Sequence, residues 1–293
     1  MRDYEVPEGK QRVRLVLGYD GTRFSGWAKQ PGRRTVQGIL EEALARITRE
    51  SVATVVAGRT DAGVHARAQE IHFDLSREAW HKMPGRAARP AGEGMVRRLT
   101  GALGAVRADD IAIHRASEAP AGFDARFGAL WRRYSYSIAD APDIVDPLRR
   151  SHTLILRERL DVAAMSAAAR SLVGENDFLS FCKPRPGATT IRTLLDFDWQ
   201  RGPDGMITAI VKADAFCHHM VRAMVGACLK VGQGTRDVTW PQELLANASK
   251  ESPMYVSRAH GLVLEEVRYP SDALLAERAA LTRASRVTND EAD

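Results

Sequence analysis

The chain has 293 residues, of which 44% are hydrophobic, 27% charged and 6% aromatic. This length is typical of about two domains, and the apolar fraction is high enough to build folded cores. No stretch approaches the roughly 18 consecutive apolar residues of a membrane span, and residues 1–7 lack the apolar segment of a signal peptide. We therefore expect a soluble, cytoplasmic protein.

The formal net charge of +5 is unevenly distributed. Residues 271–293 contain three arginines and five acidic residues, a net charge of −2, so residues 1–270 carry +7. Between Arg77 and Arg107 there are seven basic residues and only two acidic ones. This balance is typical of proteins that bind a polyanion such as nucleic acid, although solvated basic faces are equally common.

The N-terminal half shows alternating strand and helix patterns. Residues 12–19 alternate apolar and polar side chains, as a strand with one buried face does. Residues 35–49 repeat apolar side chains at helical spacing, with Thr35 as the expected N-cap. The further expected elements are strands at 52–57 and 69–74, a helix near 93–104 and a strand at 111–115. The order β-α-β-β-α-β is that of a ferredoxin-like fold.

The C-terminal half repeats this order. Its expected elements are a strand at 131–138, a helix at 161–173, strands at 191–200 and 206–213 joined by a hairpin turn, a helix at 216–231 and a strand at 262–269. We therefore predict an α+β fold of two ferredoxin-like halves, residues 11–115 and 116–270. Residues 271–293 are polar and are expected to form a peripheral helix or a frayed tail.

The segment Gly58-Arg59-Thr60-Asp61-Ala62-Gly63-Val64-His65 is the first candidate for chemistry. Two glycines that flank Arg-Thr-Asp between strands predict a tight, exposed turn, which can present the Asp61 carboxylate on rigid supports. A lone loop aspartate is more often the acceptor of an ordinary Asx turn. Asp61 therefore needs support from residues elsewhere in the chain.

Arg222 could supply that support. Its predicted helix is apolar nearly all round, which indicates burial, and an arginine is seldom buried without a carboxylate partner. Asp61 is one candidate partner, and the pairing would keep that carboxylate ionised and fix its orientation. A third candidate is the strand at 131–138, where Tyr134 lies on one face and Arg133 on the other. These residues suit base stacking and phosphate contacts, or equally the core of an edge strand.

Metal-binding and disulfide patterns are weak. Cys182, Cys217 and Cys228 have an odd count and no metal-ligand spacing. Cys217 and Cys228 would lie about 16 Å apart on one helix, too far to bridge, so we expect three small apolar core residues. His218 and His219 are adjacent and should diverge by about 100° on a helix, unlike the i, i+4 pair of a metal site. We predict no metal site.

Together these stretches resemble the tRNA pseudouridine synthase A family (the TruA family) over residues 12–270. The matching segments are residues 17–27, 35–38, 58–65 with Gln69, Phe127 with 132–134, 172–178, Phe216 with 218–222, and 225–226. The 58–65 segment is highly specific, and the others are specific in combination and order.

The resemblance implies roles for individual residues. Asp61 would be the nucleophile, and Arg222 its ionic partner. Tyr134 would stack on the target base and take part in proton transfer, and Leu262 would line the pocket. Arg59 would help to extrude the target nucleotide, and Arg133 is a further candidate for phosphate contact.

The implied substrate is uridine in the anticodon stem-loop of tRNA, at about positions 38 to 40. The family is homodimeric, needs no cofactor, and builds its two halves into a mostly antiparallel central sheet, with helices on one side and a basic cleft. The carboxylate could attack C1′ of the ribose or C6 of the base, and the sequence does not choose. Alternatives are a tRNA-binding module without catalysis, or a nucleoside hydrolase or glycosylase, which would usually need a second carboxylate or a positioned water.

The chain departs from the family pattern at three positions. Gly104 and Ala108 replace an asparagine and a proline, which places the helix end and the following loop in question. Cys217 replaces a larger apolar residue beside the paired histidines. None of the three changes alters a proposed chemical group.

Overall fold

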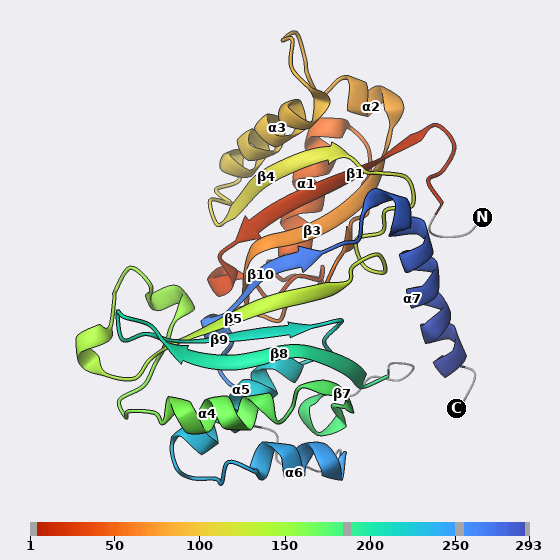
Figure 1. Ribbon diagram of the computed structural model, residues 1–293. Helices are drawn as coiled ribbons and strands as arrows, with labels where there is room; N and C mark the ends of the chain where they lie inside the picture. Colours follow the sequence, from red (N-terminus) through yellow and green to blue (C-terminus); the bar gives the residue numbers. More distant parts are fainter. Residues whose placement is uncertain (1–4, 184–188, 250–254, 291–293) are drawn as a thin grey trace. The chain divides into compact units, whose positions relative to one another are not determined.

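Figure 1 shows the computed structural model of the chain, which describes residues 5–183, 189–249 and 255–290. The chain forms two compact units. The first contains Met1–Leu130 and Glu266–Ala284, and the second contains Trp131–Glu265 and Ser285–Asp293. Among the described residues, no helix is long and apolar enough to cross a membrane.

The first unit contains a sheet and helices in the predicted chain order. Its elements are β1 (Lys10–Tyr19), α1 (Val36–Thr48), β2 (Val55–Val56), β3 (His65–Ser76), α2 (Arg77–His81), α3 (Ala91–Ala105) and β4 (Ile111–Glu118). The strands follow the order β4-β1-β3, β2 also pairs with β3, and all these pairs are antiparallel. Helix α1 crosses behind the strands in Figure 1 and contacts α3, which also contacts β4. The short helix α2 was not expected from the sequence.

Local patterns account for most of the first unit. Leu15 of β1 is fully buried with its alternating neighbours, and Thr35 caps α1, its Oγ1 accepting from the backbone N–H of Gly38 at 3.2 Å. Strand β3 is longer than predicted at both ends, while β2 is shorter. The extension of β3 pairs Ala66 with Tyr19 of β1. That pairing joins distant segments, so no local periodicity signals it.

The second unit has the same core order with additional elements. It contains β5 (Trp131–Ala139), β6 (Leu154–Ile155), α4 (Val162–Arg170), β7 (Gly174–Asp177), β8 (Ile191–Arg201), β9 (Ile207–Ala213), α5 (Met220–Gly232), α6 (Trp240–Asn247) and the start of β10 (Leu262–Arg268). The strand order is β10-β5-β9-β8-β7, and β6 pairs with β5 in parallel. An α+β fold with mostly antiparallel strands is therefore confirmed.

Two helix boundaries in the second unit were predicted wrongly. Helix α4 ends at Arg170, three residues before the predicted end, and Gly174 begins β7, which pairs with β8. Helix α5 begins four residues later than expected, because His219 has φ +69°, a left-handed conformation that a helix does not contain. The predicted hairpin is confirmed, with Arg201 opposite Ile207 and Gly205 at φ +78° in the turn.

Much of the polar C-terminal segment forms helix α7 (Leu275–Asp290). Leu275 and Ala279 are 1% and 2% exposed, so the start of the helix is packed into the first unit. Arg283 forms an ion pair with the buried Asp124. That carboxylate also accepts hydrogen bonds from two backbone N–H groups of its own turn. The tail is thus a docked peripheral helix, one of the two forms expected.

His72 lies beside this turn and should make the first unit acid-sensitive. Burial lowers the pKa of His72 from 6.5 to about 4, and its unprotonated Nδ1 accepts from the backbone N–H of Ala125 at 3.0 Å. The unfolded chain therefore binds this proton more readily, and stability is lost as pH falls from 6.5 towards 4. We expect about 2 kcal/mol less unfolding free energy at pH 5 than at pH 7 from this group.

Urea unfolding at both pH values tests this expectation. His72→Asn is the matched variant, because its amide oxygen can accept the same hydrogen bond without titrating. It should lose less stability on acidification than the unmodified protein. Equal losses in the two proteins would show that another group controls the response.

Candidate active site

Asp61 lies in a tight turn between β2 and β3 of the first unit. Its carbonyl accepts a hydrogen bond from the backbone N–H of Val64 at 3.2 Å, and Gly63 has φ +79°, a conformation that favours glycine. Asp61 is half-buried, and Arg59 is exposed. The glycine-bounded segment therefore forms a tight turn that carries one carboxylate and one guanidinium.

The segment after β1 supports this turn through its backbone. The N–H of Trp27 donates to the carbonyl of Thr60 at 3.0 Å, and the N–H of Gly63 donates to that of Phe24 at 3.4 Å. A Cβ atom on Gly26 would lie 2.9 Å from the Thr60 oxygen. The two segments thus approach too closely for a larger residue at position 26.

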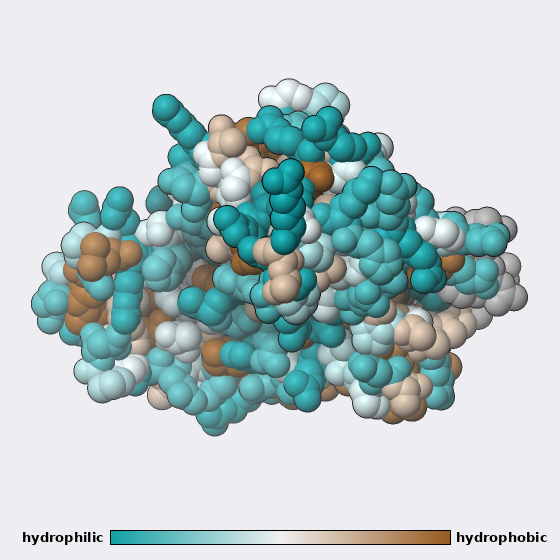
Figure 2. Space-filling view, turned by 90° about the horizontal axis from the view of Figure 1, so that it is seen from above, coloured by the Kyte–Doolittle hydropathy of each residue, from teal (hydrophilic) through white to brown (hydrophobic). Residues whose placement is uncertain are grey.

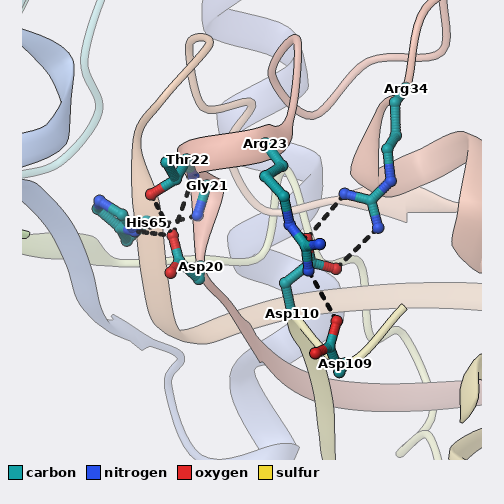
Figure 3. Close-up of polar contacts among 8 residues, drawn as sticks. All are labelled: Asp20, Gly21, Thr22, Arg23, Arg34, His65, Asp109 and Asp110. Atoms are coloured by element: carbon teal, nitrogen blue, oxygen red, sulfur yellow. Dashed lines mark hydrogen bonds and ion pairs between the residues drawn. The ribbon is translucent and has the colours of Figure 1, made fainter. Parts of the chain in front are cut away.

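Figure 3 shows the polar contacts at the other end of this support. The backbone N–H of Gly21 lies 3.0 Å from Nδ1 of His65, and the same nitrogen lies 3.1 Å from the Asp20 carboxylate. The N–H and hydroxyl of Thr22 donate to Asp20 at 2.9 and 2.5 Å. Burial acts to raise the pKa of Asp20, but the hydrogen bonds from Thr22, together with the nearby charges of His65 and Arg23, lower that pKa below its usual value. His65, at the end of the 58–65 segment, therefore helps to hold the Asp20–Thr22 turn.

Figure 3 also shows an ion-pair cluster that anchors the loop after α3. Arg34 binds Asp110 through two hydrogen bonds of 2.8 and 2.9 Å. Arg23 donates to Asp110 at 3.1 Å and to Asp109 at 2.7 Å. The guanidinium of Arg34 also lies 4.1 Å from the ring centroid of Phe24. The loop after α3 is thereby tied to the segment that supports the Asp61 turn.

The two departures from the family pattern in this loop are accommodated. Nothing lies within 4 Å of a Cβ built on Gly104, so the loss of a side chain there leaves no buried gap. Ala108 is 1% exposed, and its N–H donates to the carbonyl of Leu103 at 3.0 Å. A proline has no N–H and could not form this bond. The end of helix α3 is therefore closed by a backbone hydrogen bond that a proline at position 108 could not form.

Tyr134 and Arg133 lie on β5 of the second unit, where they pair with Val211 and Lys212 of β9. Strand β5 lies between β10 and β9, so it is an interior strand and not the edge strand considered above. Tyr134 is buried, and its ring makes an edge-to-face contact with Phe216 at 5.2 Å between centroids. Phe216 belongs to a matching segment of the sequence, but it was not assigned a role there.

Arg222 lies in the first turn of α5, not in the middle of a longer helix. It is half-buried, and its Nε donates to the carbonyl of Ser257 at 2.9 Å. His218 and His219 precede the helix, and their ring centroids are 4.0 Å apart. The expectation that they diverge was wrong, because it assumed helical geometry at both residues.

The cysteines also differ from the prediction. Cys182 and Cys217 form a disulfide, with Cα atoms 5.8 Å apart, and Cys228 is a free, buried thiol. Burial raises the pKa of Cys228 to about 12. Cys182 and Cys217 are separated by 35 positions in the sequence, so their proximity depends on tertiary contacts.

The predicted site residues divide between the units. Asp61 and Arg59 belong to the first, whereas Tyr134, Arg222 and Leu262 belong to the second, together with Arg133. Leu262 is 4% exposed and begins β10, which pairs with the strand of Tyr134. The pairing of Asp61 with Arg222 and the absence of a metal site stay predictions.

Comparison with known proteins identifies the family. The family model for tRNA pseudouridine synthase matches residues 16–128 and 168–270. The chain is 54% identical to tRNA pseudouridine synthase A of Streptomyces griseus, over 98% of this chain and 97% of that protein. It is 46% identical to the protein of the same name from Mycobacterium leprae, over 94% and 95% of the two chains.

The family match covers most of an α+β chain in which a supported glycine turn carries a carboxylate. The protein is therefore of the class of isomerases that act on tRNA. The chain belongs to the tRNA pseudouridine synthase family. Each of the two matched ranges includes a residue of the candidate site, Asp61 in the first and Arg222 in the second.

Proposed function

We propose that this chain converts uridine to pseudouridine in the anticodon stem-loop of tRNA, at about positions 38 to 40, with Asp61 as the covalent nucleophile. The observation that carries the proposal is the supported turn that presents Asp61 in a chain of this family. The relatives of 54% and 46% identity are both named tRNA pseudouridine synthase A. The protein would act in the cytoplasm.

The reaction requires one bond exchange at the ribose. The N1–C1′ bond breaks, the base rotates, a C5–C1′ bond forms, the proton on C5 leaves, and N1 gains a proton. Substrate and product are isomers, so no group or electron is consumed. The ionised carboxylate of Asp61 would form a temporary bond with C1′ or with C6 and release it when the new bond forms.

The other site residues would hold the base and the RNA. Stacking on the Tyr134 ring is worth about 1–3 kcal/mol per base, which would retain the detached base while it turns. Arg222 would orient the nucleophile, and Leu262 would line the pocket. Removing a base from its stack costs a few kcal/mol, and Arg59 and Arg133 would offset part of that cost through contacts with the vacated space or with phosphates.

Surface charge supports an RNA substrate. Six of the seven basic residues between 77 and 107 are exposed, namely Arg77, Lys82, Arg86, Arg97, Arg98 and Arg107. The face seen in Figure 2 is largely hydrophilic. We propose that these side chains belong to a basic cleft for tRNA.

We also propose that residues 11–115 and 116–270 are two ferredoxin-like domains, followed by the tail 271–293, in a homodimer. The strand orders β4-β1-β3-β2 and β10-β5-β9-β8 place equivalent strands in the same positions of the two halves. Leu148 is 85% exposed, and Ile155 is 47% exposed. Such apolar side chains are suited to burial against a second copy.

Mapping of pseudouridine in tRNA tests the function directly. Pseudouridine at positions 38 to 40 should be present in tRNA from cells with the gene and absent in tRNA from cells without it. Treatment of unmodified tRNA with the purified protein should introduce pseudouridine at the same positions. Loss of the base without pseudouridine would indicate a glycosylase. Binding without any change would indicate a tRNA-binding module, and either result would overturn the proposal.

A Tyr134→Phe variant should separate stacking from proton transfer. The ring is kept, so the affinity for tRNA should be unchanged, while the single-turnover rate should fall by about 100-fold because general acid–base catalysis is lost. Tyr136→Phe is the matched control, because Tyr136 lies on the same face of β5. Its hydroxyl donates to the carbonyl of Arg258 at 2.8 Å. An unchanged rate for Tyr134→Phe would exclude a chemical role for that hydroxyl.

A further inference from the structure

A chain of buried hydrogen bonds lies directly beneath the turn that carries Asp61. The side-chain amide of Gln69 donates to the carbonyl of Gly58 at 2.9 Å and to the hydroxyl of Tyr19 at 3.3 Å. That hydroxyl lies 2.8 Å from Oγ1 of Thr60. Gln69, Tyr19 and Thr60 are 0%, 5% and 7% exposed, so water does not compete for these bonds.

The direction of the bonds from Gln69 follows from its donors. The Nε2 group of Gln69 has two protons, and the two bonds above use both. The Tyr19 oxygen therefore accepts from Gln69, and in its second hydrogen bond, with Thr60, either hydroxyl can be the donor. Burial raises the pKa of Tyr19 to about 12, so the phenol keeps its proton throughout the neutral range. The remaining polar atom, Oε1 of Gln69, accepts from the backbone N–H of Glu70 at 3.2 Å.

These bonds act at two points of one short turn. They hold the carbonyl of Gly58 and the side chain of Thr60, the residue immediately before Asp61. The carbonyl of Thr60 is held from the other side by the N–H of Trp27 at 3.0 Å. Thr60 is thus restrained through both its side chain and its backbone, and the Asp61 carboxylate begins one residue further on.

We propose that Tyr19, Thr60 and Gln69 are positioning residues, which hold the Asp61 carboxylate in the geometry needed for attack on the nucleotide. The inference rests on the proposed role of Asp61 as nucleophile. Displacement of a reacting group by about 1 Å can reduce a rate by about 100-fold, so a restraint adjacent to the nucleophile has a large kinetic effect. If the three residues only filled the core, their loss would lower stability without a specific effect on the chemical step.

The test removes single hydroxyl groups and measures single-turnover rates at saturating tRNA together with the Kd for tRNA. Tyr19→Phe and Thr60→Val should each lower the rate by about 10- to 100-fold and leave the Kd within about twofold. The double variant should be no slower than the slower single one, because both substitutions break the same bond. Thr60→Ser keeps the hydroxyl and should restore most of the rate.

Tyr269→Phe is the stability control. Its hydroxyl donates to the carbonyl of Ala125 at 2.7 Å in the buried part of the same unit, away from the turn. It should lower the melting temperature as much as Tyr19→Phe does and leave the rate unchanged. Hydrogen exchange at the N–H of Trp27 adds a readout that does not depend on activity, and Tyr19→Phe should accelerate it.

The outcomes separate this inference from the proposed function. Turnover by Asp61→Asn would exclude Asp61 as the nucleophile and would overturn the inference together with the proposed function. If turnover depends on Asp61 but Tyr19→Phe reacts at the unmodified rate, the proposed function stands and the positioning role is overturned. A rate loss in Tyr269→Phe equal to that in Tyr19→Phe would also overturn it, since the effect would then be one of general stability.

Discussion

Asp61→Asn is expected to bind tRNA with unchanged affinity and to form no pseudouridine. The amide has nearly the same shape as the carboxylate, so the turn and its backbone bonds should persist. An amide oxygen is a poor nucleophile, and the rate should fall below detection, which is at least about 10⁴-fold. Quantification of pseudouridine after prolonged incubation with tRNA, at enzyme concentrations above the Kd, measures this loss.

Asp109→Asn is the matched control for that experiment. Asp109 lies in the same unit, its side chain is 81% exposed, and its ion pair with Arg23 is on the surface. Exposed pairs contribute little to stability, so this variant should be folded and fully active. Pseudouridine formation by a folded Asp61→Asn protein would exclude the carboxylate as the nucleophile.

Gly226→Ala should be the most damaging small substitution in the second unit. A Cβ atom at this position of α5 would lie 1.6 Å from the carbonyl oxygen of Tyr255. The backbone of α5 and the irregular segment at Tyr255 would have to separate, so we expect a loss of about 3 kcal/mol and a melting temperature about 10 °C lower. The same segment contacts Arg222 through the Ser257 carbonyl at 2.9 Å, so activity should fall as well.

Gly101→Ala gives the opposite expectation for the same change. Gly101 lies in α3, and nothing is within 4 Å of a Cβ built there. Alanine is favoured over glycine in a helix by about 1 kcal/mol, so the variant should be as stable as the unmodified protein or slightly more stable. Thermal unfolding of both variants decides the matter, and equal melting temperatures would contradict the close approach at Gly226.

Elements with a clear local pattern were predictable. The apolar spacing of α1 and its Thr35 cap, the alternation in β1, and the turn between β8 and β9 each depend on residues close together in the chain. The short strands β6 and β7 and the helix α6 were missed. Strands β6 and β7 have only two and four residues, too few for a period to be recognised, and they form by pairing with β5 and β8.

Some parts of the candidate site were easier to predict from the sequence than others. The glycine-bounded motif identified Asp61, because a tight turn leaves a signature in a short stretch of sequence. The support of that turn left a weaker signal. The sequence marks Gln69 only as part of a matching segment and does not distinguish Tyr19 and Thr60 from their neighbours. Their hydrogen bonds join residues up to 50 positions apart.

The sequence by itself determined the family, the order of the longer strands and of most helices along the chain, and the identity of the carboxylate in the 58–65 turn. These properties depend on periodicity and on short motifs, which are local. Only the tertiary structure decided three further features. His219 adopts a left-handed conformation directly before α5, Cys182 forms a disulfide with Cys217, and β5 is an interior strand. The tertiary structure also revealed the buried bonds beneath Asp61. Each of these features depends on close packing between segments that are far apart in the chain. The pattern of residues along the sequence does not say which distant segments come together.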